Sequence, residues 1–347
     1  MTRRPPGAAT GPGPGSAGQD PTGRAAPARS RPGLPVLAIT LGDPCGVGPE
    51  LIARVIADAS RRDLDRWIGC GSFAALREAF GRLFPRRRLP PDLRWQEVGG
   101  PGPFPVGAVS AAGGRAAVAA IEAAHTLCMT GTCAGMVTGP IGKEAIRLAG
   151  SPFAGHTDML QALAGVPATR MAMVHGRFRV VMTTLHVAWR EVPRLLTAPA
   201  VYETILAAHT AFATRRRPHP VIAVAGLNPH AGEHGLFGDE EERAILPAIV
   251  RARQVNPNIT GPWPADSLFK ADRRRTTDVF VAQTHDQGLI AIKARGGLRC
   301  VNVTLGLPYV RTSVGHGTAY DIAGRGLADH RGLLAALRLA DRLARKG

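Results

Sequence analysis

The sequence lacks both the long apolar runs of a membrane protein and the cysteine spacing of a disulfide-bonded or thiolate-metal protein. No hydrophobic stretch reaches the roughly 18–20 residues that a membrane-spanning helix requires. The five cysteines are scattered without a CxxC pair, so we expect buried free thiols. No apolar segment follows Arg3 and Arg4, and we therefore predict no secretory signal and a cytoplasmic location.

Aromatic residues are also scarce, and this limits what the large positive charge can mean. The formal net charge is +17, but only 5% of the residues are aromatic and the arginines are dispersed. Proteins that bind nucleic acid by base stacking combine basic residues with aromatic ones. We therefore predict a solvated basic surface with no nucleic-acid and no membrane partner, whose charge attracts an anionic substrate.

Short apolar runs alternate along the chain with Ala- and Leu-rich stretches of helical periodicity. Strands are predicted at 34–41, 67–71, 134–139, 221–227, 278–284 and 300–307, with two more joined by a turn at 175–177. Helices are predicted at 46–59, 71–80, 115–129, 143–150 and 333–346. This alternation predicts an α/β fold with a largely parallel sheet. Residues 1–34, rich in Pro, Gly, Ala and Arg, are predicted to form a disordered tail.

Three histidines stand at or shortly after the ends of predicted strands: His186, His230 and His285. Neighbouring strands of one sheet would bring them together as three neutral nitrogen ligands of a catalytic divalent metal, with Asp286 in support. Ordinary polar loop histidines explain the same pattern equally well.

A second group of residues suits a phosphate. His156 and Thr157 follow a glycine and precede a helical stretch, which favours an anion site at a helix start. A helix cap, with Thr157 or Asp158 bonding backbone amides, explains the segment as well. Lys143 begins another helix, where it either meets a phosphate or is solvated. The glycines of 42–50 do not have the GxGxxG spacing, so no Rossmann domain is predicted.

Seven ordered motifs carry a resemblance to one family. They are GDPCGVGPE (42–50), TGPIGKEA (138–145), GHTDML (155–160), AGLNPHAGEHGLFGDEE (225–241), GPWPADSLF (261–269), THDQGLIAIK (284–293) and VNVTLGLPYVRTSVGHGTAYDIAGRG (301–326). From about residue 35 onward the chain resembles the 4-hydroxythreonine-4-phosphate dehydrogenases of the vitamin B6 pathway. The resemblance implies an isocitrate/isopropylmalate-dehydrogenase-like fold of two α/β/α subdomains with a cleft between them. We place these at 35–140 plus 295–347, with the cofactor loop, and at 141–294, with the metal and substrate site.

The resemblance further implies a homodimer with active sites at the interface, and oxidation of a small phosphorylated hydroxy acid. The family oxidises 4-phosphohydroxy-L-threonine with NAD or NADP to a 3-oxo acid, which decarboxylates to 3-amino-2-oxopropyl phosphate. It uses one divalent metal per active site, for which zinc, cobalt, magnesium, manganese and nickel are candidates. The family's metal ligands fall on His186, His230 and His285, the trio selected above.

The family's other functional positions are carried over residue by residue. Its substrate-binding positions fall on His156, Thr157, Lys293, Asn302 and Arg311. The segment that resembles the adenine-binding loop of isopropylmalate dehydrogenases supplies the cofactor-side candidates His316, Gly317, Thr318 and Asp321. Lys293 is the candidate proton carrier if burial lowers its pKa, and Asp286 is assigned together with Lys293 to the catalytic group.

Four positions depart from the family pattern as we expect it. Gly315 stands where Asp is common, Trp263 replaces a smaller aliphatic residue, Gly142 a larger polar one, and Leu185 a second Thr. These departures fit a branch that oxidises D-erythronate or L-threonate 4-phosphate, because a lost carboxylate at 315 removes a partner for a substrate amino group. Alternatives from other classes are a non-catalytic metal- or phosphate-binding protein, and a phosphotransferase or acyltransferase without redox chemistry.

Overall fold

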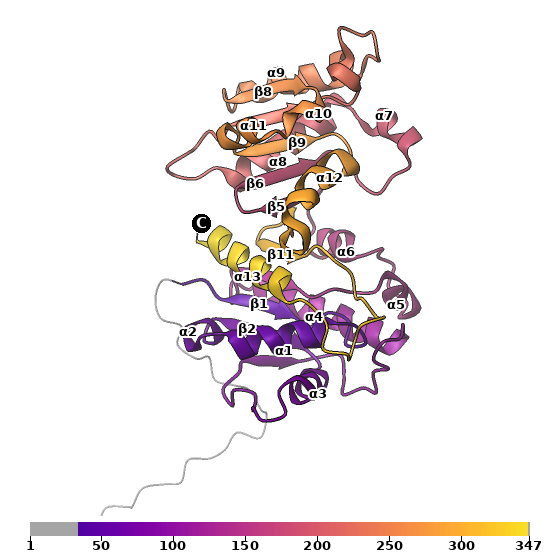
Figure 1. Ribbon diagram of the computed structural model, residues 1–347, viewed down its shortest axis with the longest axis vertical. Coiled ribbons are helices and arrows are strands. Elements are labelled where there is room, and N and C mark those ends of the chain that lie inside the picture. Colours follow the sequence, from indigo (N-terminus) through magenta and orange to yellow (C-terminus); the bar gives the residue numbers. More distant parts are fainter. Residues whose placement is uncertain (1–33, 346–347) are drawn as a thin grey trace, which may run out of the picture.

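A single eleven-stranded sheet runs through residues 34–345, the part of the chain that the computed structural model describes (Figure 1). The tail predicted at 1–34 lies, except for its last residue, outside that range. The strands of the sheet are β1 (Leu37–Thr40), β2 (Trp67–Gly71), β3 (Trp95–Glu97), β4 (Gly135–Thr138), β5 (Arg170–His175), β6 (Phe178–Met182), β7 (Ile222–Ala225), β8 (Ile259–Trp263), β9 (Val279–Ala282), β10 (Val301–Leu305) and β11 (Val310–Val314). Their order in the sheet is β3-β2-β1-β4-β11-β10-β5-β6-β9-β7-β8.

The sheet is parallel toward both ends and antiparallel in its middle. β10 runs antiparallel to both β11 and β5, and β5 runs antiparallel to β6. The other pairs are parallel, which confirms the predicted α/β fold with a largely parallel sheet. The β5–β6 hairpin turns at Gly176 and Arg177, as predicted. Strands β3, β8 and β11 were not predicted.

The helices that cover the sheet are α1 (Gly48–Asp58), α2 (Arg61–Leu64), α3 (Phe73–Leu83), α4 (Ala111–Met129), α5 (Lys143–Leu148), α6 (His156–Leu163), α7 (Val192–Leu195), α8 (Ala198–Phe212), α9 (Leu246–Arg253), α10 (Ala265–Leu268), α11 (Ala271–Thr276), α12 (His285–Gly296) and α13 (Arg331–Ala344). Those predicted correspond to α1, α3, α4, α5, α13 and the start of α6, whereas the others, among them α8, α9 and α12, were not predicted. Both α5 and α6 pack against α4, although they follow the predicted subdomain boundary at residue 141. The exact division of the chain therefore remains a prediction.

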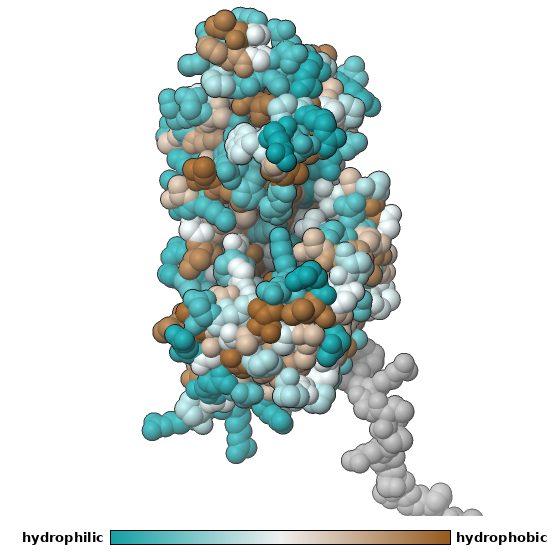
Figure 2. All heavy atoms as spheres, turned by 90° about the vertical axis from the view of Figure 1, so that its right-hand side faces the viewer, coloured by the Kyte–Doolittle hydropathy of each residue, from teal (hydrophilic) through white to brown (hydrophobic). Residues whose placement is uncertain are grey.

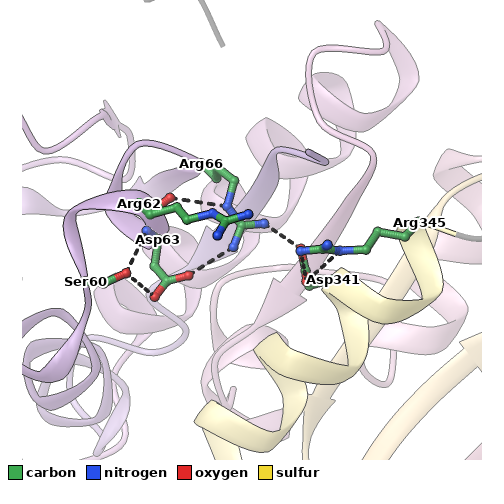
Figure 3. A network of polar contacts seen from close by, with 6 residues as sticks. All are labelled: Ser60, Arg62, Asp63, Arg66, Asp341 and Arg345. Atoms are coloured by element: carbon green, nitrogen blue, oxygen red, sulfur yellow. Dashed lines mark hydrogen bonds and ion pairs between the residues drawn. The ribbon is translucent and has the colours of Figure 1, made fainter. Parts of the chain in front are cut away.

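The last helix, α13, is fastened to the N-terminal half by its apolar face and by ion pairs. Its leucines recur at helical spacing, so that Leu333 and Leu337 are buried on the sheet. Arg66, just before β2, donates to Asp341 (2.5 Å) and to Asp63 (3.0 Å), and Arg345 also pairs with Asp341 (Figure 3). The Arg66 side chain is only 13% exposed, which reduces the screening of these pairs by solvent. Elements from the two ends of the described chain are thus held together.

The cysteine prediction is confirmed, since all five cysteines are free and buried. Burial is the main cause that raises the pKa of the Cys70 thiol to about 12 and that of Cys133 to about 11. These thiols are therefore protonated and unreactive at neutral pH. Among the helices of residues 34–345, none combines the length and apolar character needed to cross a membrane.

Candidate active site

A cleft of about 610 Å³ opens at the middle of the sheet, where β5, β10 and β11 meet helices α5, α6 and α12. In Figure 2 the surface is hollowed midway along the long axis of the molecule. The cleft collects most of the predicted site residues: His156, Thr157, His186, His285, Lys293, Asn302, Arg311 and His316. Four other lining residues were singled out in the sequence without a firm catalytic or binding role: Lys143, Asp158, Leu185 and Gly315. Ser313 also lines the cleft and was not predicted.

Arg311 is the most deeply buried charge in this cleft. It lies on β11 with 2% of its surface exposed, and its guanidinium donates to Thr138 Oγ1 (2.7 Å) and Thr304 Oγ1 (2.9 Å). Burial lowers the pKa of Arg311 to about 10, so the group still carries its charge at neutral pH. Both partners are neutral hydroxyls, and Nε has no partner among the residues described. A buried cation held in this way is suited to an anionic ligand.

Two further buried polar atoms of the cleft lack partners within the described chain. They are His156 Nε2 and Asn302 Oδ1. Burial, and then the nearby Arg311, lower the pKa of His156 well below its ordinary value, so this imidazole is neutral. Because buried polar atoms are normally hydrogen-bonded, three orphaned atoms in one cleft indicate that a polar ligand completes it.

Helix α6 presents His156 and Thr157 to the cleft from its first turn. The Asp158 carboxylate accepts the backbone N–H groups of Ala154 and Gly155 (2.5 and 2.9 Å) and so fixes the start of the helix. The capping interpretation of this segment is therefore confirmed for Asp158. It leaves His156 and Thr157 free to face a ligand at the positive end of the helix dipole.

His186 and His285 lie side by side, with ring centroids 5.3 Å apart. They follow β6 and β9, which are parallel neighbours. His285 is the first residue of α12, whose start is fixed because Thr284 and Gln287 form a capping box. His285 Nδ1 lies 2.7 Å from Asp286 Oδ1, and Asp286 itself lines a smaller adjoining recess. Burial, Lys143 and His285 lower the pKa of His186, which favours the neutral ring.

The third histidine, His230, is not brought to this pair. It is exposed on the 3₁₀ turn Pro229–Gly232 with a left-handed backbone (φ 55°). Within residues 34–345, no three or more His, Cys, Asp or Glu side chains are grouped so that they could hold a metal ion. The buried carboxylate of Glu241 shapes the His230 turn by accepting the N–H groups of Leu227 (2.7 Å) and Asn228 (2.9 Å). Glu241 was not predicted as a site residue. The one indication of it in the sequence is the acidic run Asp239–Glu241 at the end of the 225–241 motif.

The cofactor-side candidates lie on one loop that borders the cleft. His316 lines the cleft, Thr318 is buried and Asp321 is exposed. The Thr318 carbonyl accepts the N–H of Val47 (2.9 Å), and a Cβ on Gly46 would lie 2.8 Å from the same oxygen. The two glycine-rich segments 42–50 and 315–326 are therefore in contact. A second cavity, of about 210 Å³, adjoins them and is lined by Gly46, Glu50, Phe104 and Gly324, among others.

This arrangement, a cleft with an unpaired buried cation at the middle of an α/β sheet, is typical of enzymes that act on small anions. The family model described as pyridoxal phosphate biosynthetic protein PdxA matches residues 85–340, and the chain belongs to this family.

Curated relatives and solved structures agree with the family assignment. The 4-hydroxythreonine-4-phosphate dehydrogenase of Beijerinckia indica is 43% identical over 88% of this chain and 94% of its own length. The D-threonate 4-phosphate dehydrogenase of Cupriavidus necator is 40% identical over 90% and 98%. The crystal structure of the Klebsiella pneumoniae 4-hydroxythreonine-4-phosphate dehydrogenase covers 89% of this chain and 99% of its own, with 34% identity and a TM-score of 0.78. The chain is therefore a dehydrogenase of the predicted family and fold.

Proposed function

We propose that this enzyme oxidises 4-phosphohydroxy-L-threonine with NAD or NADP to a 3-oxo acid that decarboxylates to 3-amino-2-oxopropyl phosphate. The observation that carries this proposal is the set of orphaned polar atoms on His156, Asn302 and Arg311. A phosphate would accept hydrogen bonds from Arg311 Nε and His156 Nε2, and a hydroxyl or ammonium group of the same substrate would donate to Asn302 Oδ1. A relative named for this activity is 43% identical to the chain.

The residues of the cleft take separate roles in this proposal. Arg311 and His156 bind the phosphate, with Thr157 and Asn302 as further hydrogen-bonding partners. Lys293 lines the cleft from α12 but is exposed in the single chain, so its role as carrier of the proton that leaves the substrate hydroxyl requires that bound ligands bury it. His316, Gly317, Thr318 and Asp321 hold the dinucleotide.

The side chains of His186 and His285 fit one divalent metal. His285 Nδ1 is occupied by Asp286, which leaves Nε2 as the coordinating atom and fixes the ring. When bound, the metal polarises the oxygen of the substrate's reacting carbon. Imidazole nitrogens bind zinc, nickel and cobalt more tightly than manganese or magnesium, but metal availability decides as much as affinity, so all five metals remain candidates.

Substitution of Asp286 by Asn is expected to weaken metal binding about 10- to 100-fold, because an amide oxygen accepts a weaker hydrogen bond from His285 Nδ1 than a carboxylate does. The measurement is the metal content at equilibrium with buffered free metal. Asp58→Asn is the matched control, since it changes the other His–Asp pair, His330 with Asp58 (2.8 Å), and should leave metal affinity unaltered. Equal affinities of the Asp286 variant and the wild type would remove Asp286 from the metal site.

We also propose the homodimer with its active sites at the interface, in which His230 from a second copy completes the metal site. The loop that carries His230 also carries two exposed apolar side chains, Leu236 (70% exposed) and Phe237 (45% exposed). Apolar side chains of this size are more stable when a partner covers them. A second copy would also explain why the same chain keeps His230 away from His186 and His285.

A second candidate substrate is a four-carbon sugar acid phosphate: D-threonate, L-threonate or D-erythronate 4-phosphate. The observation that favours it is Gly315, which lines the cleft and offers no carboxylate to a substrate ammonium group. Packing provides a separate reason for glycine, since a Cβ at 315 would lie 2.9 Å from the Cys300 carbonyl oxygen. The relative from Cupriavidus necator is named for the D-threonate reaction.

The deciding assay follows reduced nicotinamide by absorbance with metal-loaded protein. All four substrates are compared, each with NAD and with NADP. We expect the highest kcat/KM with 4-phosphohydroxy-L-threonine. A higher kcat/KM with a sugar acid phosphate would replace the proposed substrate by the second candidate. No reduction with any of the four would refute both.

A further inference from the structure

Tyr320 connects the cofactor loop, defined as residues 315–326, to a buried carboxylate. Its hydroxyl donates to Asp43 Oδ2 at 2.6 Å, although the two residues are 277 positions apart in the sequence. Asp43 is fully buried, and its Oδ1 accepts the N–H of Cys45 (2.9 Å). Burial and Asp43 raise the pKa of Tyr320, so the phenol remains protonated and acts as the donor.

Asp43 also reaches a third segment, the turn between β4 and α5. Its backbone N–H donates to the carbonyl oxygen of Pro140 (2.9 Å). That turn, residues 139–143, brings Ile141 and Lys143 to the wall of the cleft. Asp43 and Tyr320 therefore link the cofactor loop to the segment that presents Lys143.

The same contact explains the departure at Gly142. A Cβ at this position would lie 2.1 Å from Tyr320 Oη. The backbone of Gly142 (φ −86°, ψ 119°) is one that any residue adopts, so chain conformation does not require glycine here. The space where the family pattern has a larger polar side chain is filled instead by the Tyr320 hydroxyl.

We propose that Tyr320 is a positioning residue for dinucleotide binding, which holds the cofactor loop against Asp43 and the 139–143 turn. The proposal rests on the proposed function in taking residues 315–326 as the cofactor loop. Tyr320 acts through the loops, since it does not line the cleft itself. Without the bond from its hydroxyl, the dinucleotide has to order the loop when it binds, which weakens binding more than it slows the chemical step.

The first test is Tyr320→Phe, which keeps the ring and removes the hydroxyl. We expect the KM for the dinucleotide to rise about tenfold while kcat changes less than about twofold. Backbone amides of 315–326 and 139–143 should exchange hydrogen faster in the variant without any dinucleotide. Tyr202→Phe is the control, because its ring lies under Arg251 (4.0 Å) on the distant α8–α9 layer and keeps that contact.

The exchange measurement separates this proposal from the proposed function, because it requires neither substrate nor turnover. If the wild type fails to reduce NAD or NADP, dinucleotide affinity is measured instead by the fluorescence of bound reduced nicotinamide. Unchanged exchange in both segments overturns the loop linkage. Faster exchange with unchanged dinucleotide KM or affinity overturns the positioning role.

A double-substitution cycle tests the contact with Gly142 directly. Gly142→Ala should displace the Tyr320 hydroxyl and raise the dinucleotide KM about as much as Tyr320→Leu. With leucine at 320 the added methyl group meets no hydroxyl, so the double variant should bind the dinucleotide no worse than Tyr320→Leu alone. Independent, additive effects of the two substitutions would contradict the coupling.

Discussion

An Arg311→Met variant is expected to lose about 100- to 1,000-fold in kcat/KM with the phosphorylated substrate, because a buried charge that pairs with the ligand is removed. Arg311 is 2% exposed and its two recorded partners are the neutral hydroxyls of Thr138 and Thr304. Because so little of Arg311 is exposed, water screens its charge from an anion in the cleft less than it would at the surface. Methionine has a similar length and fills much of the same volume.

Two controls distinguish lost phosphate binding from a damaged fold. Arg338→Met removes one positive charge from the exposed face of α13 and should leave kcat/KM near the wild-type value. The substrate analogue without its phosphate should be used equally poorly by the wild type and by Arg311→Met. The assignment of Arg311 to phosphate binding is supported if Arg311→Met keeps the wild-type thermal transition but no longer prefers the phosphorylated substrate to the analogue. If Arg311→Met still prefers the phosphorylated substrate to the analogue as the wild type does, the phosphate binds elsewhere.

Mixed dimers of His186→Ala and His230→Ala chains are expected to recover activity that neither variant has alone. Each pure variant should fall below about one per cent of the wild-type rate, because every site lacks one metal ligand. If His230 is supplied by a second copy, a mixed dimer contains one complete site and one that lacks both ligands. Random exchange of chains makes half of the dimers mixed, so about a quarter of the wild-type activity should return.

The matched control is a mixture of His186→Ala chains with His285→Ala chains. These two histidines belong to the same chain's pair, with ring centroids 5.3 Å apart, so no mixed dimer of these variants has a complete site. Its activity should remain at the level of the separate variants. Failure of the first mixture to recover activity, with chain exchange verified by mass, would refute a metal site shared between copies.

The histidine pair shows how far strand-end reasoning from the sequence reaches. His186 and His285 meet because β6 and β9 are parallel neighbours that end at the same edge, as Met182 is paired with Ala282. His230 follows β7, which also neighbours β9, but it lies on a left-handed turn at the end of a loop that buried Glu241 holds at Leu227. The path of that turn depends on contacts that spacing along the sequence does not encode.

Strand β11 and the Tyr320 contact mark the other limit of prediction. The segment 310–314 contains Arg, Thr and Ser, so its hydrophobicity gives no strand signal. It becomes a strand because β4 and β10 pair with it on both sides, and Arg311 is buried between Thr138 and Thr304. The bond from Tyr320 to Asp43 spans 277 positions, and only the departure at Gly142 hinted at it.

The antiparallel middle of the sheet has a mechanical consequence for the enzyme. β11, β10 and β5 continue the backbone hydrogen bonding across the floor of the cleft, from the N-terminal half of the sheet to the C-terminal half. The two halves therefore cannot rotate about a flexible loop, since any closure over a ligand has to twist these strands.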